Sequence, residues 1–458
     1  MSIFTPLSIG RSALLAHERA ISTTGQNIAN AETPGYRRQT TEFAPQDERH
    51  GYGVRVVAVE QAVDRFLEAQ LMRQESHAAA ADLRSDILDR VQDLFPVEEP
   101  SVHGSLDAFW GAAQRFADRP EDLAVRGDLI ARAEELAARI RSVASHLGLQ
   151  QRELDERLGG EADEANAVLA RIAALNGEIV AAEAGGERAN ELRDQRQIAL
   201  SELAGYVEVQ TRESENGSID VHLQSSGLSL VLGSDVQQLV RGVGSATGLD
   251  GNPLSTLGVQ LGSGAVIDLP ANPGGRIGAL LILRDDDLAG HAASLDAFAL
   301  ALRDSVNAVQ TDPAATDLDG LPGGDFFSGS GAANLTVNLS DPRGLAAAVG
   351  ANPADNRNAL ALLDVREASQ AGLAGANLTD FYAGLQAGVG TAARSARDEA
   401  TLASSVKTSL EGQRNSVSGV SLEEEFTDLI RFQRGFQAAA QLISVSDRLL
   451  QDLIGLVR

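Results

Sequence analysis

The sequence predicts a mainly α-helical protein with an inserted β domain, in a discontinuous multi-domain chain. Three observations lead to this fold class. Aromatic residues make up only 4% of the 458 residues, a composition that favours long helices packed through small side chains. Apolar residues recur every seven positions at both ends of the chain. In the middle, from Tyr206, the apolar period changes from helical to two, as in strands.

The N-terminal helix is predicted from Pro6 to about Asn30. Thr5 can accept hydrogen bonds from free amides at the helix start, and Pro6 has no amide hydrogen that would be left without an acceptor. The seven-residue series along it predicts a narrow seam and consists of Leu7, Leu14, Ile21 and Ile28.

A turn and a hairpin follow this helix. Thr33-Pro34-Gly35-Tyr36 is a turn signal, because proline presets its own φ and glycine tolerates positive φ. The segments "YRRQTTEF" and "YGVRVVAVE" then alternate like two paired strands. Asn27 and Asn30 could bond to the backbone of this turn or to an adjacent subunit, and the sequence leaves both open.

The middle of the chain is expected to place a β region between two helical halves. Asn216-Gly217 is a hairpin signal within that region. A turn-rich stretch covers 311–355. The helices are predicted at about 62–95, 104–118, 121–158, 161–183, 187–204, 274–310 and 379–415.

The last helix carries the most regular pattern. Ser421 and Glu424 form a capping-box pattern, and Glu423 to Glu425 suit the positive end of the helix dipole. The heptad series comprises Leu422, Leu429, Phe436, Ile443, Leu450 and Val457, with Phe432, Ala439, Ser446 and Leu453 at a second heptad position. Each terminal stripe could be the buried face of an ordinary bundle. We favour terminal helices that pair with each other and with neighbouring subunits, because both ends are charge-neutral.

Charge supports this division of the chain. The formal net charge is −26, whereas residues 1–60 hold six basic and six acidic residues. An acidic surface repels phosphate, so nucleic acid is not an expected partner. Membrane insertion is not expected either, since no signal peptide and no 18-residue apolar run is visible. The absence of cysteine excludes disulfides and thiolate metal sites.

The sequence gives little support for catalysis. Its seven histidines are scattered and form no HExxH pair, and we find no nucleophile elbow or phosphate loop in a suitable context. "RDDD" at 284–287 and "DLDGLPGGD" at 317–325 do not match a calcium loop and are interpreted as a solvated helix face and a turn-rich loop. We therefore expect no enzyme activity, no catalytic residue, no cofactor and no metal.

Specific motifs resemble a known family. "NIANAETPGYRRQ" is similar to the N-terminal signature of the bacterial flagellar axial proteins, namely rod, hook and hook-associated proteins. "EEEFTDLIRFQRGFQAAAQLISVSDRLLQDLI" is similar to their C-terminal helix. Interior segments such as "NELRDQRQIALSELAGYVEV" and "DLDGLPGGDFF" resemble the hook-associated members at the hook–filament junction. Two departures are Gly25-Gln26, where relatives often have Asn-Asn, and a small β region.

The resemblance implies three domains. Residues 1–60 with 412–458 would form a terminal coiled-coil assembly domain, 61–205 with 274–411 a helical domain, and 206–273 an outer β domain. It also implies a structural, self-assembling component of the flagellum that is needed for filament assembly and motility. Its implied partners are further copies of itself, hook protein, a second hook-associated junction protein and a cytoplasmic export chaperone. Export would use the flagellar type III route without a cleaved signal peptide.

The residues expected to act in self-assembly lie at both ends. In the N-terminal part they are Leu7, Leu14, Ile21, Asn27, Ile28, Asn30, Thr33, Pro34, Gly35 and Tyr36. In the C-terminal helix, which would also bind the chaperone, they are Leu422, Leu429, Phe432, Phe436, Ile443, Leu450, Leu453 and Val457. We expect Asn27→Ala or Asn30→Ala to weaken incorporation while leaving monomer stability unchanged.

Two other interpretations remain. The chain could be a flagellar hook or rod protein, which the position of tagged protein along an isolated flagellum would reveal. It could also be a secreted enzyme or adhesin that acts through the acidic middle, which predicts a wall-hydrolysis or glycan-binding activity in residues 61–411.

Overall fold

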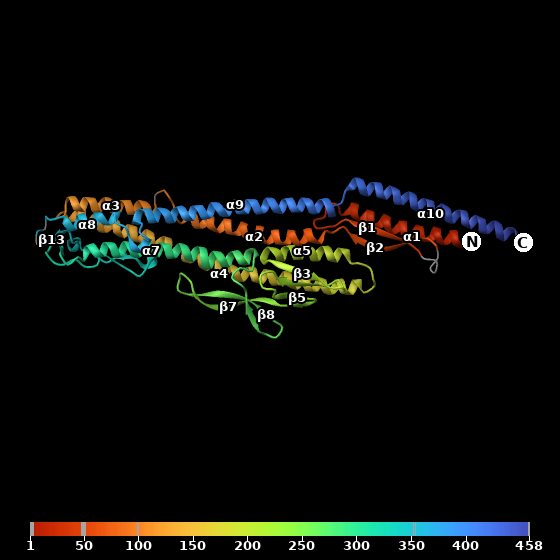
Figure 1. Ribbon diagram of the computed structural model, residues 1–458, viewed down its shortest axis with the longest axis horizontal. Coiled ribbons are helices and arrows are strands. Elements are labelled where there is room, and N and C mark those ends of the chain that lie inside the picture. Colours follow the sequence, from red (N-terminus) through yellow and green to blue (C-terminus); the bar gives the residue numbers. More distant parts are fainter. Residues whose placement is uncertain (1–3, 47–51, 99, 351, 353, 457–458) are drawn as a thin grey trace.

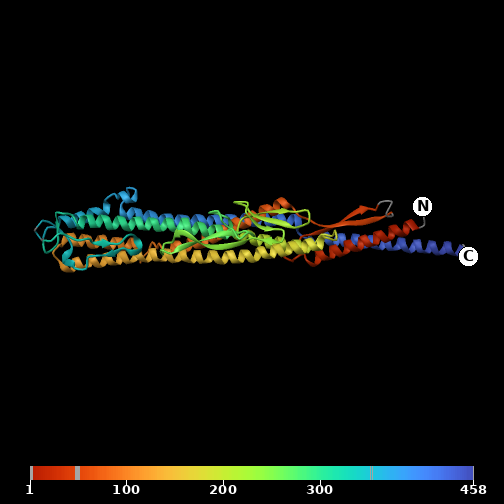
Figure 2. The ribbon, with the colours of Figure 1, turned by 90° about the horizontal axis from the view of Figure 1, so that it is seen from below.

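The computed structural model describes residues 4–46, 52–98, 100–350, 352 and 354–456. The protein is elongated, with long helices along its axis (Figure 1). Seen from below, α1 (Phe4–Ala29) and α10 (Leu422–Leu456) lie together at one tip (Figure 2). The predicted fold class, mainly α with an inserted β region, is confirmed.

The remaining α-helices form the long helical body of the molecule, which we call the rod. Most agree with the predicted ranges to within a few residues. Their bounds are α2 (Arg65–Asp93), α3 (Val102–Asp118), α4 (Leu123–Glu183), α5 (Asn190–Tyr206), α6 (Gly275–Ile282), α7 (Leu288–Gln310), α8 (Arg357–Glu367) and α9 (Leu378–Ser418). A π-helical turn, η1 (Leu283–Asp287), joins α6 to α7, and 3₁₀ turns occur at η2 (Ala332–Asn334), η3 (Pro342–Gly344) and η4 (Ala371–Leu373).

The strands form small antiparallel sheets. The N-terminal hairpin pairs β1 (Gln39–Pro45) with β2 (Val54–Gln61), as predicted. The inserted region has one sheet in the order β3-β4-β5-β6 and one in the order β7-β8-β9. Their strands are β3 (Val209–Glu213), β4 (Ile219–Leu223), β5 (Ser229–Leu232), β6 (Asp235–Val236), β7 (Gln238–Thr247), β8 (Pro253–Gln260) and β9 (Val266–Asp268). The turn-rich stretch adds the pairs β10 (Ala315–Thr316) with β13 (Ala348–Val349) and β11 (Phe327–Ser328) with β12 (Thr336–Val337).

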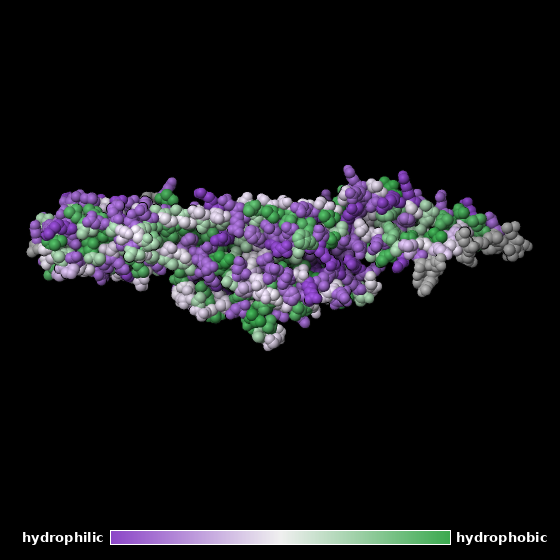
Figure 3. Space-filling model, in the orientation of Figure 1, coloured by the Kyte–Doolittle hydropathy of each residue, from purple (hydrophilic) through white to green (hydrophobic). Residues whose placement is uncertain are grey.

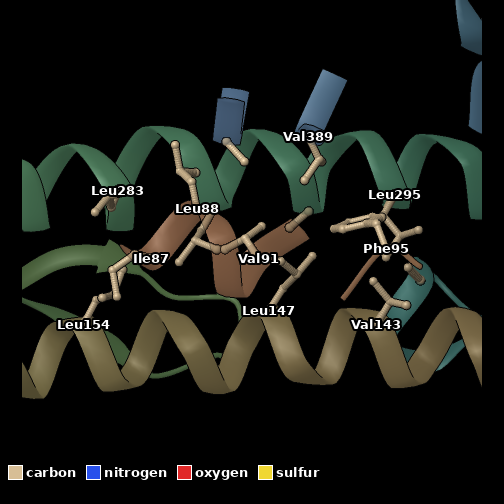
Figure 4. Close-up of a cluster of buried hydrophobic side chains, with 14 of the residues drawn as sticks. Ile87, Leu88, Val91, Phe95, Val143, Leu147, Leu154, Leu283, Leu295 and Val389 are labelled. Carbon is tan, nitrogen blue, oxygen red and sulfur yellow. The ribbon is translucent and has the colours of Figure 1, made fainter. Parts of the chain in front are cut away.

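One continuous hydrophobic core runs along the rod. Figure 4 shows side chains from α2, α4, α7 and α9 meeting in its interior. Leu147 of α4 and Leu295 of α7 are fully buried there, and Val91 of α2 points into the space between these two helices. Burying one such side chain stabilises a fold by about 1.5–3 kcal/mol. The side chains of this core therefore hold the helices of the rod together.

The predicted break between helices at 158 and 161 is wrong, because α4 is a single helix of 61 residues. Gly159 and Gly160 lie inside it, where each costs about 1 kcal/mol relative to alanine. Leu158 and Ala162 are buried on either side of the glycine pair. Their packing offsets the weak helix propensity.

Two further expectations need correction. α8 was not predicted, because it follows the turn-rich stretch and is short, yet it buries Ala359, Leu362 and Val365. "RDDD" is not a wholly solvated face, since the Arg284 side chain is buried and its Nη1 donates to Asp155 Oδ1 at 2.6 Å and to Ser255 O at 2.8 Å. The π-helical turn lets Arg284 join the α6–α7 segment to α4 and to the inserted sheet.

Helix α4 also contains a stretch apolar enough, by length and composition, to cross a membrane. In the structure this helix lies within the bundle and buries residues along its whole length, from Val125 to Ile179. A core helix of a bundle passes the same composition test. The stretch therefore has a structural explanation in the rod.

Candidate assembly interface

The two ends of the chain form one structural unit, which we call the terminal unit and define as α1, β1, β2 and α10. Within it α1 contacts α10 and both strands of the hairpin. The hairpin is attached partly through side chains, as when the Val54 amide donates to Ser12 Oγ at 3.3 Å. The N-terminal helix therefore connects the hairpin to the C-terminal helix.

Small residues occupy the deepest positions between α1 and α10. Ala439 is buried on α10, and a Cβ on Gly435 of α10 would lie 2.6 Å from the His17 ring of α1. A Cβ placed on Gly10 would lie 2.7 Å from Ile443 Cγ1 and 3.3 Å from the Ala439 carbonyl oxygen. The two backbones thus approach too closely for a larger side chain, and the seam depends on glycine and alanine.

Three aromatic rings join the elements of the terminal unit at its centre. His17 of α1, Phe43 of β1 and Phe432 of α10 form a triangle with ring centroids 6.0–6.2 Å apart. Burial lowers the pKa of His17, so the imidazole stays neutral at physiological pH and packs as an aromatic ring. This cluster supplies apolar contact between all three elements.

Asn27 is the polar centre of the unit and is 1% exposed. Its Nδ2 donates to Gln39 O at 2.8 Å and to Glu425 Oε2 at 2.9 Å. Its Oδ1 accepts from the Gln39 amide at 3.0 Å and from the Tyr36 hydroxyl at 2.9 Å. One amide thereby fixes the register of α1 against both the hairpin and α10, all within one chain.

The acidic start of α10 does more than cap a helix. Glu425 is 2% exposed, and its Oε1 accepts from Arg38 Nε at 2.7 Å. Glu424 Oε2 accepts from Arg38 Nη1 at 2.8 Å. The interpretation of Glu423 to Glu425 as capping and dipole charges is therefore incomplete, because ion pairs with the distant Arg38 bury Glu425.

The N-terminal residues predicted for assembly differ in their surroundings. Asn30 is half-buried, and its Nδ2 donates to Gln26 O at 3.0 Å within its own helix. Burial, with the nearby charges of Asp194 and Glu425, raises the pKa of Tyr36 to about 12, so its hydroxyl remains a donor to Asn27. The seam residues Leu7, Leu14, Ile21 and Ile28 are half-buried, whereas Thr33, Pro34 and Gly35 are exposed.

The C-terminal residues follow the predicted seam within the chain. Leu429, Phe432, Phe436, Ile443 and Leu450 are half-buried, and α10 contacts α1 along its length. Leu422 is the exception, at 45% exposed. Leu453 belongs to α10, and Val457 lies outside the described residues. Their role in assembly stays a prediction.

Two apolar strips on α10 were not predicted. The Phe426 strip consists of Phe426 and Ile430, and the Leu449 strip consists of Leu442, Val445 and Leu449. All five side chains are between 38% and 56% exposed. Ile430 comes one position after the seam residue Leu429, whereas Leu442 and Leu449 come one position before the seam residues Ile443 and Leu450. Because successive residues of a helix are about 100° apart, the two strips lie on opposite sides of the seam. Apolar residues at positions next to a heptad seam were the sequence signal that could have indicated these strips.

The hairpin also contacts the rod through α5. Gln61 Nε2 donates to Asp194 Oδ1 at 2.8 Å. Just before the hairpin, Arg37 Nη2 lies 2.8 Å from Glu68 Oε1 of α2, and Arg37 Nη1 lies 3.8 Å from Asp194 Oδ1. Burial raises the pKa of Asp194 to about 6, against the attraction of Arg37. This carboxyl is the most perturbed acidic group at the junction between the terminal unit and the rod.

Asp194 predicts a pH dependence of stability. Between the unfolded pKa of about 3.9 and about 6, the folded chain retains a proton that the unfolded chain has lost. The free energy of unfolding contributed by this group should fall as pH rises through that window, by up to about 1.4 kcal/mol per pH unit. Urea titrations at several pH values give the free energy of unfolding of the unaltered chain and of the Asp194→Asn variant. The contribution of Asp194 is the difference between these two pH dependences. Equal pH dependence in both would contradict it.

No group of three or more histidine, cysteine, aspartate or glutamate side chains with metal-binding spacing occurs in the described part of the chain. The interface instead consists of helical seams, buried amides and ion pairs.

Comparisons with known proteins agree with these features. Residues 88–327 match the family model of the flagellar hook-associated protein FlgK helical domain. Residues 7–37 match the flagella basal body rod protein model, and residues 412–456 match the flagellar basal body rod FlgEFG protein C-terminal model. The two terminal matches cover most of α1 and all of α10.

Curated relatives match over nearly full length. Flagellar hook-associated protein 1 of Salmonella typhimurium is 26% identical, with 97% of this chain and 98% of the relative covered. The protein of the same name from Bacillus subtilis is 26% identical, covering 99% and 98%. A solved structure, the flagellar hook junction protein FlgK from Burkholderia pseudomallei, has a TM-score of 0.70 at 16% identity and covers 76% of this chain and 100% of its own. That last likeness shows the fold.

The helical-domain match covers more than half of the chain, and the terminal matches add the segments that build the terminal unit. The model that matches the middle of the chain is that of the FlgK helical domain, whereas the rod-protein models match the two terminal segments. The chain belongs to the flagellar hook-associated protein FlgK family, a family of structural components of the bacterial flagellum.

Proposed function

We propose that this chain assembles with copies of itself at the junction between hook and filament, and that filament assembly and motility need it. The observation that carries the proposal is the terminal unit, in which the family motifs form a closed seam and leave apolar strips outside. The proposed neighbours are hook protein on one side, in keeping with the hook named in the relatives' descriptions, and a second hook-associated junction protein on the other, as the family resemblance implies.

The apolar strips supply the proposed contact surface. Side chains such as Phe426 and Leu449 are more than half exposed, and Leu15 of α1 is 55% exposed. Figure 3 shows hydrophobic surface interspersed with hydrophilic surface over the tip where α1 and α10 lie. Apolar side chains on a helix that already has one intramolecular partner favour packing against further helices.

The positions of the strips support a repeating assembly over a closed dimer. The Phe426 strip lies on one side of the seam in the first half of α10, and the Leu449 strip on the other side in the second half. Two different surfaces on opposite sides can contact neighbours head to tail, which generates a ring or a helix. We therefore assign intermolecular packing to these strips and intramolecular pairing to the predicted heptad residues.

Replacing one strip tests this assignment. Leu442→Ser/Val445→Ser should abolish incorporation into flagella, because it removes apolar area from a subunit contact. The free energy of unfolding should change by less than about 1 kcal/mol, because both side chains are already exposed. Incorporation is measured by immunolabelling isolated flagella, and stability by urea titration.

The control for the strip variant is Leu402→Ser on α9, where the side chain is 66% exposed on the rod. It should leave incorporation unchanged. Normal incorporation of the strip variant, or equal loss in the control, would exclude the strip as the subunit contact.

We further propose the three domains that the sequence suggests, with the boundary before the C-terminal helix moved from residue 412 to Gly419, where α9 ends. A cytoplasmic chaperone would hold α10 before export, and export would use the flagellar type III route without a cleaved signal peptide. The same strips support the chaperone contact, since an exposed apolar surface needs to be covered before assembly.

We infer that the chain does no chemistry. Wall hydrolysis or glycan binding by residues 61–411 at useful rates would refute this.

A further inference from the structure

The inserted β domain, residues 206–273, is joined to the rod by two chain segments that lie together. The Glu208 amide donates to Pro273 O at 2.9 Å, so the entry and the exit of the domain are neighbours. Gly275 has a φ of 59°, and a Cβ on it would lie 2.5 Å from Tyr206 O. A domain that is attached to its neighbour at one place can swing about that place unless other contacts hold it.

Apolar packing covers one face of the β domain without choosing its orientation. Leu239, Leu257 and Val259 of the β7-β8-β9 sheet belong to the same hydrophobic core as the rod helices. Apolar burial is non-directional, because its free energy depends on the area removed from water. Directional contacts come from polar side chains of α4.

Asn166 of α4 pairs with an edge strand in the way that another strand would. β7 lies at the edge of its sheet. Asn166 Nδ2 donates to Leu239 O at 2.8 Å, and the Leu239 amide donates to Asn166 Oδ1 at 2.8 Å. A strand residue directs its amide and its carbonyl to the same side, and a carboxamide offers both a donor and an acceptor. The Asn166 side chain therefore closes the edge of β7 at Leu239.

Asn176 repeats this arrangement on the other sheet and is 1% exposed. Its Nδ2 donates to Ile219 O at 2.8 Å and to Gly233 O at 2.6 Å, and its Oδ1 accepts from the Ile219 amide at 3.1 Å. Ile219 begins β4, whereas the residue pairs between β4 and β5 begin at Val221. Asn176 thus continues the strand ladder where β5 no longer pairs.

Asp155 anchors the β7-β8-β9 sheet through charge. Its Oδ1 accepts from the Ser255 amide at 2.9 Å, and its Oδ2 accepts from the Ser255 hydroxyl at 2.8 Å and from Arg241 Nη2 at 2.6 Å. The same carboxylate accepts from Arg284 of the π-helical turn. Hydrogen bonds to a charged group are roughly twice as strong as neutral ones. One carboxylate therefore joins β7 and β8 to two parts of the rod.

These anchors lie on both sides of the place where the β domain is attached. The Tyr206 hydroxyl donates to Glu164 Oε2 at 2.8 Å, so the attachment lies beside this turn of α4. At 1.5 Å per residue, Asn176 lies about 18 Å along α4 from Glu164 in one direction, and Asp155 lies about 14 Å in the other. Contacts on both sides of a pivot oppose rotation in either direction.

From this geometry we propose that α4 is a docking helix that holds the inserted β domain as a fixed arm of the rod. Asn166, Asn176 and Asp155 are its positioning residues. The arm projects from the rod beside α4, where β7 and β8 lie in Figure 1. All of these contacts lie within the rod and the β domain, so the arm depends neither on the terminal unit nor on assembly. The closed edge of β7 also offers no free backbone groups at Leu239 to a strand of another chain.

The docking variant is Asp155→Ala/Asn166→Ala, which removes five hydrogen bonds between α4 and the β7-β8-β9 sheet. Arg284 keeps Asp285 as its partner, so the variant leaves no buried cation without a carboxylate. The matched control is Glu156→Ala/Asp163→Ala, which removes two exposed carboxylates of the same helix.

The orientation of the arm is measured by the distance between two spin labels, because the chain has no cysteine of its own. The labels are attached at Gln260→Cys on β8 and Ala138→Cys on α4, which are both exposed positions. The distance distribution should be narrow in the otherwise unaltered chain and in the control. It should be at least about twofold broader in the docking variant.

Hydrogen exchange of the full chain shows whether the rod of the docking variant remains folded. Exchange should become about tenfold faster in β7 and β8 and stay unchanged in α3 and α7. Asn166→Ala alone, in which Asp155 keeps its partners, should broaden the distance distribution less than the docking variant. Asn176→Ala should accelerate exchange in β4 and not in β7.

Two results would overturn the proposal. A docking variant with a distribution as narrow as that of the control would show that the apolar core alone orients the arm. A broad distribution in the otherwise unaltered chain would show that the β domain swings about its attachment.

Discussion

Asn27→Ala is expected to destabilise the terminal unit by about 2–4 kcal/mol. The side chain is 1% exposed, and its four hydrogen bonds join α1 to the hairpin and to α10. Alanine would leave the Gln39 backbone groups, the Tyr36 hydroxyl and one Glu425 oxygen without this partner in a buried place. The measurement is hydrogen exchange in α1, the hairpin and α10 of the full chain.

This prediction differs from the expectation based on the sequence, in which Asn27→Ala leaves monomer stability unchanged and weakens only incorporation. Asn30→Ala is the matched control, since Asn30 bonds within its own turn and accepts from Thr33 Oγ1 at 3.2 Å. Its effect should stay below about 1 kcal/mol. If the two variants were equally stable, the buried network would not be what fixes the register.

Gly10→Val should separate α1 from α10, at a cost of about 3 kcal/mol. A Cβ at this position already lies 2.7 Å from Ile443 Cγ1, and valine adds two methyl groups toward the same place. The Ala439 carbonyl behind it is backbone and cannot rotate away. We expect faster exchange in both helices and loss of incorporation, measured by hydrogen exchange and by immunolabelling of isolated flagella.

The control for Gly10→Val is Gly25→Ala in the same helix. Gly25 is exposed, and a Cβ there meets no atom within 4 Å. Alanine should stabilise α1 by about 0.5–1 kcal/mol, because it has the higher helix propensity. Destabilisation by both variants would point to a general sensitivity of α1, and a neutral Gly10→Val would show that the helices do not pack as closely as described.

The two seam predictions concern the fold of a single chain, whereas the strip variant concerns contacts between chains. Asn27 and Gly10 lie inside the terminal unit, and Leu442 and Val445 lie on its outside. The variants should therefore separate into two classes, one that loses both stability and incorporation and one that loses incorporation alone.

The sequence by itself determined the local elements of this protein. Heptad spacing predicted α1 and α10, the alternation in "YRRQTTEF" and "YGVRVVAVE" predicted the hairpin, and Asn216-Gly217 predicted the β3–β4 turn. These features depend on near neighbours, whose spacing fixes backbone conformation and one apolar face. The terminal motifs also sufficed to indicate the flagellar family, because a motif can be compared with other sequences without knowledge of its tertiary contacts.

Only the tertiary structure decided which surface each residue faces. Asn27 and Glu425 are 398 positions apart and share a buried hydrogen bond, so neither residue's surroundings reveal it. The same holds for α4, where packing on both sides overrides Gly159 and Gly160, and for Gln61 and Asp194, which are 133 positions apart and share a hydrogen bond. Periodicity defines a stripe on a helix, but the partner that covers it is chosen by contacts between distant segments. The seam within the chain and the strips outside it could therefore be separated only in the folded molecule.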